Sequence, residues 1–129
     1  MKILAELKYS RDHEWVKIEG NRARIGITDY AQSQLGDVVF VEVPTIDSHI
    51  AVGMGFSVVE SVKAVSDIYA PVGGVIVEVN EALTDAPEIM NEDPYGEGWL
   101  AVIEMDAETD LGELLSSDEY EELIGAGGQ

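Results

Sequence analysis

The sequence predicts an all-β domain, a sandwich or barrel, that carries a few small helices. Three observations lead to this fold class. Most apolar residues alternate with polar ones in short runs, which is the period of half-buried strands. Glycine, proline and asparagine separate these runs, as turns do in sandwiches and barrels. Helical spacing of apolar residues is confined to segments near 28–35 and 110–124. The length of 129 residues fits a single domain spanning 1–129, with a frayed tail at 125–129.

Strands account for most of the chain. Two alternating runs, 14–19 and 22–27, flank the pair Gly20-Asn21, and together they are typical of a β-hairpin. Pro44 ends the next run, because proline has no N–H to donate to a ladder. The remaining predicted strands are 38–43, 56–62, 66–70, 75–79 and 99–105.

Two segments have helical features. Thr28 can cap a short helix that ends near Leu35, and Gly36 stands where a left-handed residue commonly follows a helix. Near the C-terminus the apolar residues return to helical spacing, and Ser116 with Glu119 forms a capping box. The apolar residues of these C-terminal helices are Leu111, Leu114, Leu115, Tyr120, Leu123 and Ile124.

Composition excludes several classes of function. The chain has seven Lys and Arg residues and 26 Asp and Glu residues, so its formal net charge is −19. Such a chain is repelled by phosphate backbones and by anionic lipids, so neither nucleic acid nor a membrane is an expected partner. The chain has no cysteine, which excludes a disulfide framework and a thiolate site. No apolar run approaches the roughly 18 residues of a membrane helix, and residues 1–8 resemble no targeting peptide. The expected location is the cytoplasm.

Motifs for metal binding, phosphate binding and hydrolysis are incomplete. His13 and His49 are the only histidines and lie far apart, and the acidic run 118–122 is best explained as a solvated helix start. The glycine pairs at 53–55 and 96–98 complete no dinucleotide or P-loop fingerprint. No serine lies in a Gly-x-Ser-x-Gly elbow. We therefore expect no metal site and no catalytic residue.

Lys63 is the most informative residue. The chain has only four lysines, and Lys63 alone lies between two strand-like runs, where a hairpin would expose its amine. Acylation at that position would replace the ammonium by a neutral amide. On spacing alone, however, a single lysine at a turn is an ordinary exposed residue.

A family resemblance gives Lys63 a specific role. Residues 60–72 (ESVKAVSDIYAPV) closely resemble the lipoyl-attachment segment of the glycine cleavage system H protein family. The likeness runs from about Leu7 to about Leu123, and its motifs follow the order of the family. These further motifs are 7–10 (LKYS), 13–15 (HEW), 26–32 (GITDYAQ), 35–44 (LGDVVFVEVP) and 94–99 (PYGEGW).

The resemblance implies a fold and a function. The fold would be a flattened barrel-sandwich hybrid, like a lipoyl domain, with Lys63 on a hairpin. The protein would be a carrier and not an enzyme, with lipoic acid joined to Lys63 as an amide. It would carry an aminomethyl group from the pyridoxal-phosphate glycine decarboxylase (P protein) to the tetrahydrofolate-dependent aminomethyltransferase (T protein). Dihydrolipoyl dehydrogenase (L protein) would then reoxidise the dithiol. Glu60 resembles the residue that lipoylating enzymes recognise.

The resemblance also implies that the arm, once loaded, folds back on the protein. The amine of its cargo is cationic and needs an anionic or hydrogen-bonding partner. Glu14 and Asp67 are the candidates for this cleft, with Asp12 a weaker third. Each of these carboxylates is equally open to a simpler interpretation as a solvated surface charge.

Three positions depart from the pattern of the family, and two other functions stay open. Asp47 and Ser57 stand where many members have glycine, which could affect lipoylation, and Gly73 replaces a common serine. The chain could instead be an H-like lipoyl relay that serves other enzymes. It could also be an acidic β-barrel interaction module in which Lys63 is unmodified.

Overall fold

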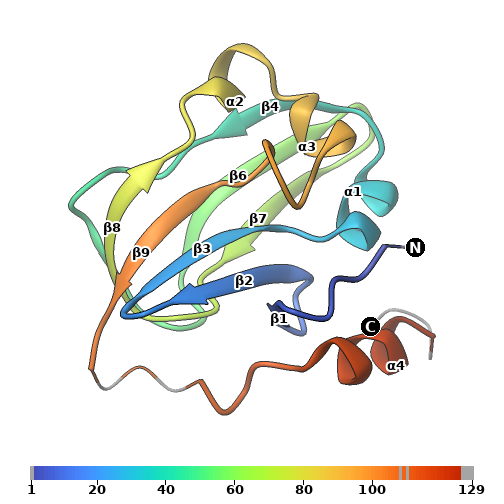
Figure 1. The fold of residues 1–129 in the computed structure, drawn as a ribbon. Helices are drawn as coiled ribbons and strands as arrows, with labels where there is room; N and C mark the ends of the chain where they lie inside the picture. The colour runs from blue at the N-terminus through green and yellow to red at the C-terminus, as the bar shows by residue number, and fades with distance from the viewer. Residues whose placement is uncertain (1, 108, 110, 126–129) are drawn as a thin grey trace.

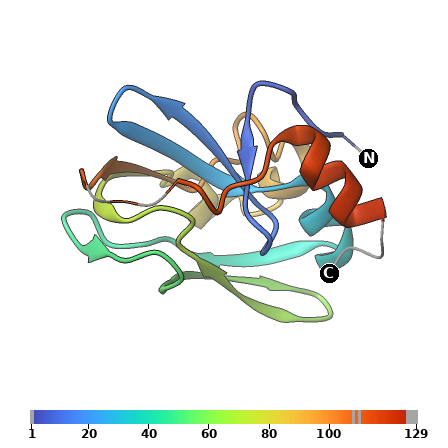
Figure 2. The same cartoon turned by 90° about the horizontal axis from the view of Figure 1, so that it is seen from below.

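The computed structural model describes residues 2–107, 109 and 111–125 and confirms a mainly β fold. Two antiparallel sheets form two layers, which Figure 2 shows one above the other. The six-stranded sheet has the order β1-β2-β3-β9-β8-β5, and the three-stranded sheet has the order β4-β6-β7. The six strands are β1 (Lys8–Tyr9), β2 (Glu14–Glu19), β3 (Arg22–Ile27), β9 (Ala101–Met105), β8 (Gly74–Val79) and β5 (His49–Ile50). The other three are β4 (Val38–Glu42), β6 (Gly55–Ser61) and β7 (Val65–Tyr69) (Figure 1).

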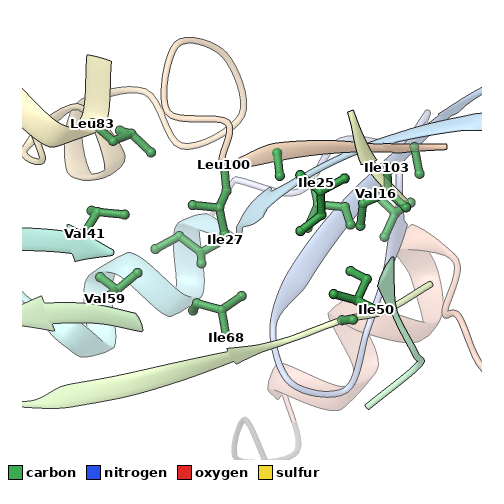
Figure 3. Packing of buried hydrophobic residues seen from close by; sticks show 14 of the residues in the cluster. Val16, Ile25, Ile27, Val41, Ile50, Val59, Ile68, Leu83, Leu100 and Ile103 are labelled. Atoms are coloured by element: carbon green, nitrogen blue, oxygen red, sulfur yellow. The ribbon is translucent and has the colours of Figure 1, made fainter. Parts of the chain in front are cut away.

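The main core fills the space between the two sheets. Val59 and Ile68 of the three-stranded sheet face Ile27 and Leu100 from the opposite side (Figure 3). These side chains are at most 4% exposed. Because strand side chains alternate between faces, each strand contributes every second residue to this layer. Burial of apolar area at roughly 25 cal/mol per Å² is the main force that holds the two sheets together.

A second apolar cluster packs residues of the segments 3–9 and 115–124 against Trp15 of β2. Tyr9 of β1 stacks on Tyr120 with ring centroids 4.6 Å apart, and both are fully buried. Trp15 donates its indole N–H to the carbonyl of Pro94 at 2.8 Å, which satisfies the one polar group of that ring. The buried members of the cluster are Leu7, Tyr9, Trp15, Leu115 and Tyr120.

The predicted helix near 28–35 is present as α1 (Asp29–Leu35). The Thr28 hydroxyl accepts a hydrogen bond from the N–H of Ala31 at 3.1 Å, which confirms it as the N-cap. Gly36 has a φ of +77°, as expected for a residue after a helix, but its ψ of −157° lies outside the left-handed helical region. Two one-turn helices, α2 (Ala82–Asp85) and α3 (Ile89–Glu92), were not predicted.

The C-terminal prediction was only half right. The helix α4 runs over Ser117–Gly125, and its capping box is present because Ser116 and Glu119 exchange bonds of 2.9 and 3.2 Å. Residues 111–115 are not helical, however. Leu115 instead pairs with Tyr9 through two backbone hydrogen bonds of 2.6 and 2.9 Å. Of the predicted frayed tail, Gly125 closes α4, and 126–129 lie outside the described residues.

The predicted strands were placed to within one or two residues, and the two-residue strands β1 and β5 were missed. Within the described ranges, every helix is too short or too polar to cross a bilayer. The same residues contain no cluster of three or more His, Cys, Asp or Glu side chains placed to hold a metal ion.

Candidate functional site

Lys63 lies in the tight turn that joins β6 to β7, as the sequence predicts. Ser61 closes the turn with its backbone N–H on the carbonyl of Ala64 at 2.8 Å. The Ser61 hydroxyl oxygen also accepts the N–H groups of Lys63 at 3.3 Å and Ala64 at 3.1 Å. This is the local side-chain bonding that makes serine a turn residue. The Lys63 side chain is exposed to solvent.

The segment after α1 forms a platform under this turn. Val62 donates its N–H to the carbonyl of Asp37 at 3.0 Å, which ties the turn to the loop before β4. A Cβ placed on Gly36 would lie 3.4 Å from Cε of Lys63. A larger side chain there would displace the lysine stem, whereas glycine leaves the stem a clear path. The stem of Lys63 therefore lies along the backbone at Gly36.

Asn91 of α3 fixes the platform, and sequence reasoning did not single it out. Its side-chain oxygen accepts the N–H of Val38 at 2.8 Å. Its amide nitrogen donates to the carbonyl of Gly36 at 2.9 Å and to the side-chain oxygen of Gln32 at 3.0 Å. A single asparagine in a turn-rich segment carries no signal of such a role. Asn91 positions the backbone on which the Lys63 turn rests.

A pocket of about 290 Å³ runs between α1 and β7, close to the platform. Leu35 precedes Gly36, and Ser66 and Asp67 follow Lys63 by three and four residues, so one end of the pocket lies near the lysine. Two of the three candidates for the cleft, Asp67 and the weaker Asp12, border this pocket, and their role there stays a prediction. Its lining residues are Asp12, His13, Ile27, Tyr30, Ala31, Gln34, Leu35, Ser66, Asp67 and Ile68.

His13 stands in the wall of this pocket and links it to α4. Its Nδ1 lies 2.8 Å from the Tyr120 hydroxyl, which also bonds the Thr28 hydroxyl at 2.7 Å. Its ring packs on Tyr30 with centroids 4.9 Å apart. His13 has a φ of +71°, a conformation that costs a non-glycine residue free energy, so these contacts hold it there. The sequence, in which the two histidines lie far apart, gave no sign of this network.

Glu14 does not border the pocket between α1 and β7. It is 2% exposed and accepts the Ser10 hydroxyl at 2.5 Å, while its own N–H donates to the same hydroxyl at 3.0 Å. Burial raises the pKa of the Glu14 carboxyl to about 7, although bonds from Ser10 and the Tyr69 backbone oppose the shift. Glu14 lines a second cavity of about 150 Å³, and Asp12 borders both cavities.

Glu60 belongs to the three-stranded sheet. It pairs with Phe40 of β4 on one side and with Val65 of β7 on the other. All three lie on the face turned away from the core, because their neighbours Val41 and Val59 point into it. Glu60 is therefore displayed beside the lysine turn, where another protein can contact it.

Two of the three departures from the family pattern, Asp47 and Ser57, have clear local roles. Asp47 has a φ of +72°, a left-handed conformation that suits glycine and that aspartate tolerates better than most residues. Ser57 is buried and donates its hydroxyl to the carbonyl of Glu42 at 2.6 Å. Val38 pairs with Ser61, next to the lysine turn, so β4 leads away from that turn and Asp47 follows at its far end (Figure 1). An effect of Asp47 on lipoylation stays a prediction.

The fold and the site together define a class of protein. An exposed lysine at the turn of a hairpin, in a small two-sheet domain with a pocket beside it, is the arrangement of a carrier domain that presents a covalently attached arm. The family model described as "Glycine cleavage H-protein" matches residues 7–126. The chain belongs to the glycine cleavage H-protein family.

Individual relatives agree over nearly the full length. The glycine cleavage system H protein of Carboxydothermus hydrogenoformans is 54% identical over 124 residues, which are 96% of this chain and 95% of that protein. The H protein of Staphylococcus haemolyticus is 55% identical over 125 residues, 97% of this chain and 99% of its own. The crystal structure of an H protein from Mycobacterium marinum superposes with a TM-score of 0.88 at 42% identity. It covers 95% of this chain and 99% of that one.

Family membership confirms the carrier function expected from the sequence. The chain is a non-catalytic lipoyl carrier that takes an aminomethyl group from the P protein to the T protein and is then reoxidised by the L protein, and lipoylating enzymes load its cofactor. The reactions belong to the cofactor and the partner enzymes, and the carrier supplies presentation and protection.

Proposed function

We propose that Lys63 is the lysine that carries the lipoyl group. The observation that supports this most strongly is its position. Lys63 is exposed in a hairpin turn that rests on the platform formed by the segment after α1. Of the other lysines, Lys8 and Lys17 belong to strands of the six-stranded sheet, and Lys2 precedes β1. Family motifs on both sides of Lys63 support the same assignment.

The modification removes one positive charge from the carrier. The neutral amine of Lys63 attacks the carbonyl carbon of lipoate that a lipoylating enzyme has activated as an acyl adenylate. An amide bond forms, adenylate leaves with the C–O bond electrons, and the amine gives up a proton. Glu60 is the proposed recognition residue for this enzyme, because its carboxylate is displayed three residues before the lysine.

The pocket between α1 and β7 is the proposed resting place of the distal end of the arm. When bound, lipoic acid supplies a dithiolane whose sulfur accepts the aminomethyl group. Asp12 and Asp67 border the pocket with carboxylates that can bind the cationic amine of this cargo. Ile27, Leu35 and Ile68 line its apolar part, which limits the access of water to the arm.

Glu14 has a different proposed role, because it is buried and lines the second cavity and not the first. With a pKa near 7, its carboxyl is divided between neutral and ionised forms at neutral pH. A cation that reached the second cavity would favour the ionised form and be bound more tightly as the pH rises. Glu14 therefore tunes the retention of the cargo with pH.

The experiment measures how fast the isolated, loaded protein loses its aminomethyl group. Asp67→Asn and Asp12→Asn should each speed this loss severalfold at pH 7. Glu14→Gln should speed it mainly above pH 7, where the native carboxylate is charged. Glu81→Gln, an exposed carboxylate beside α2, is the matched control and should leave the rate unchanged. Equal decay rates in all four variants would contradict this assignment of the pocket.

A cytoplasmic location and a single functional domain complete the proposal. The partner enzymes draw on pyridoxal phosphate, tetrahydrofolate and NAD, which are intracellular molecules. Both sheets share one core. Cell fractionation with an antibody against this chain tests the location directly, and recovery in the secreted fraction would contradict it.

A further inference from the structure

The most exposed large apolar side chains surround Lys63. Among the described residues, the three highest exposures of this kind belong to Val65 at 69%, Val62 at 68% and Val39 at 53%. Phe40, next to Val39, is 47% exposed. We call Val39, Phe40, Val62 and Val65 the collar. Exposed apolar groups that cluster in this way commonly mark a surface that another protein covers.

A β-bulge in β4 creates half of the collar. The pairing with β6 passes from Val38–Ser61 to Phe40–Glu60, so Val39 is the extra, unpaired residue. Regular alternation would turn one of two successive side chains into the core. The bulge instead leaves both Val39 and Phe40 exposed, beside the end of β6 that leads into the lysine turn.

Acidic side chains lie next to the collar. Glu60 lies between Phe40 and Val65 in one cross-strand row, and Asp67 follows Val65 on β7. The basic residues Lys17, Arg22 and Arg24 lie on the six-stranded sheet. A partner that covers the collar must therefore combine an apolar contact surface with basic groups that meet the carboxylates.

The length of the lysine side chain indicates which class of partner enzyme comes close enough to contact the collar. An enzyme that acylates Lys63 has to reach Nζ itself, at the end of a four-carbon stem that passes along Gly36. Val62 adjoins Lys63 in the chain, and Val39 follows Val38, which pairs with Ser61, so we expect an enzyme that reaches Nζ to contact both side chains. Enzymes that act on the completed arm meet the dithiolane when the arm is extended, with the whole lipoyl chain between the dithiolane and Nζ.

We infer that the collar and Glu60 form the docking surface for the lipoylating enzyme. The complementary surface is an apolar recess with a basic group, placed at the mouth of the channel that holds the activated lipoate. This inference rests on the proposed assignment of Lys63 as the lipoylated residue. The apolar collar supplies contact area, and Glu60 supplies orientation.

The test compares lipoylation of the unmodified carrier and of its variants by a lipoate–protein ligase with ATP and lipoate. Intact mass follows the appearance of the lipoyl amide. The double variant Val39→Ser/Val62→Ser should lower kcat/KM about tenfold, which is the effect of losing a small cluster of interface contacts. Val39→Ile/Val62→Ile keeps the apolar surface and should retain the native rate. Ile46→Ser, which is 48% exposed in the native protein, is the control and should also be unchanged.

Further readouts separate the outcomes. The Kd of the unmodified carrier for the ligase should rise in the serine double variant in proportion to the loss of kcat/KM, while its thermal unfolding stays close to that of the native chain. Once lipoylated by long incubation, this variant should exchange the aminomethyl group with the P protein within twofold of the native rate. An unchanged lipoylation rate, or an equal loss with the P protein, would overturn the inference. If the native chain gains no lipoyl group on Lys63, the proposed attachment site has failed instead.

Discussion

The buried carboxyl of Glu14 should make the stability of the protein depend on pH in an unusual direction. Its pKa rises from an ordinary 4.5 to about 7 because folding removes it from water. The folded state therefore binds a proton more tightly than the unfolded state does. By linkage, the stabilisation is complete below pH 4.5, declines as the pH rises, and is lost above pH 7.

The size of the effect follows from the shift. A change of 7 − 4.5 in pKa corresponds to roughly 3 kcal/mol, at 1.36 kcal/mol per pKa unit. Most of this, about 2.5 kcal/mol, is lost between pH 5 and pH 8. Glu14→Gln keeps a hydrogen-bonding side chain of the same shape but has no charge to bury, so this variant should lack the decline.

Urea unfolding of the native protein and of Glu14→Gln at several pH values measures the effect. The difference between the two free energies of unfolding should shift in favour of the variant by about 2–3 kcal/mol from pH 5 to pH 8. Other carboxylates titrate in both proteins, so the difference isolates Glu14. Parallel profiles for the two proteins would refute the argument and place the native pKa near its ordinary value.

Other parts of the structure give further expectations. Tyr120→Phe removes a buried hydroxyl that bonds His13 and Thr28 at 2.8 and 2.7 Å, so it should lower the free energy of unfolding by about 1–3 kcal/mol; a cost below measurement error in urea titrations would argue against that network. Gly26→Ala would place a Cβ 2.6 Å from the Trp15 indole nitrogen, so the ring must move and the variant should lose about 1–3 kcal/mol together with a shift in tryptophan emission; an unaltered spectrum and melting temperature would disprove the close contact. The net charge of −19 should make kcat/KM for the shuttle fall with added salt more than kcat does, and a flat salt profile would reduce the charge to a role in solubility.

The longer strands were predictable because their apolar alternation is strong. The hairpin over 14–19 and 22–27 and the helix capped by Thr28 follow from local patterns that tertiary packing reinforces. The strands β1 and β5 are two residues long and have too little periodicity to detect. The helices α2 and α3 are single turns, whose formation depends on packing rather than on propensity.

Within the predicted C-terminal helices near 110–124, residues 111–115 are not helical for an identifiable reason. Leu114 packs against the main core, whereas Leu115 is buried in the second apolar cluster. An extended chain can direct successive side chains to opposite sides, and a helix cannot. The pairing of Leu115 with Tyr9 therefore overrides the helical spacing of the leucines.

The candidate site was predictable in its lysine and less so in its surroundings. The family motifs single out Lys63, and the spacing of four residues places Asp67 near it. The proximity of Asp12 to Asp67 depends on the fold, because the two lie on segments far apart in the chain. The support from Asn91 and the separate burial of Glu14 likewise arise from tertiary contacts that local sequence does not encode.

The most direct test of the central claim locates the lipoyl group and asks whether the shuttle depends on it. The native chain and Lys63→Arg are each produced in cells that make lipoate, examined by intact mass and peptide mass spectrometry, and assayed for glycine–bicarbonate exchange with the P protein. The account predicts one lipoyl amide, on Lys63, with exchange in the native chain and neither in the variant. A lipoyl group on another lysine, or exchange that survives Lys63→Arg, would contradict it.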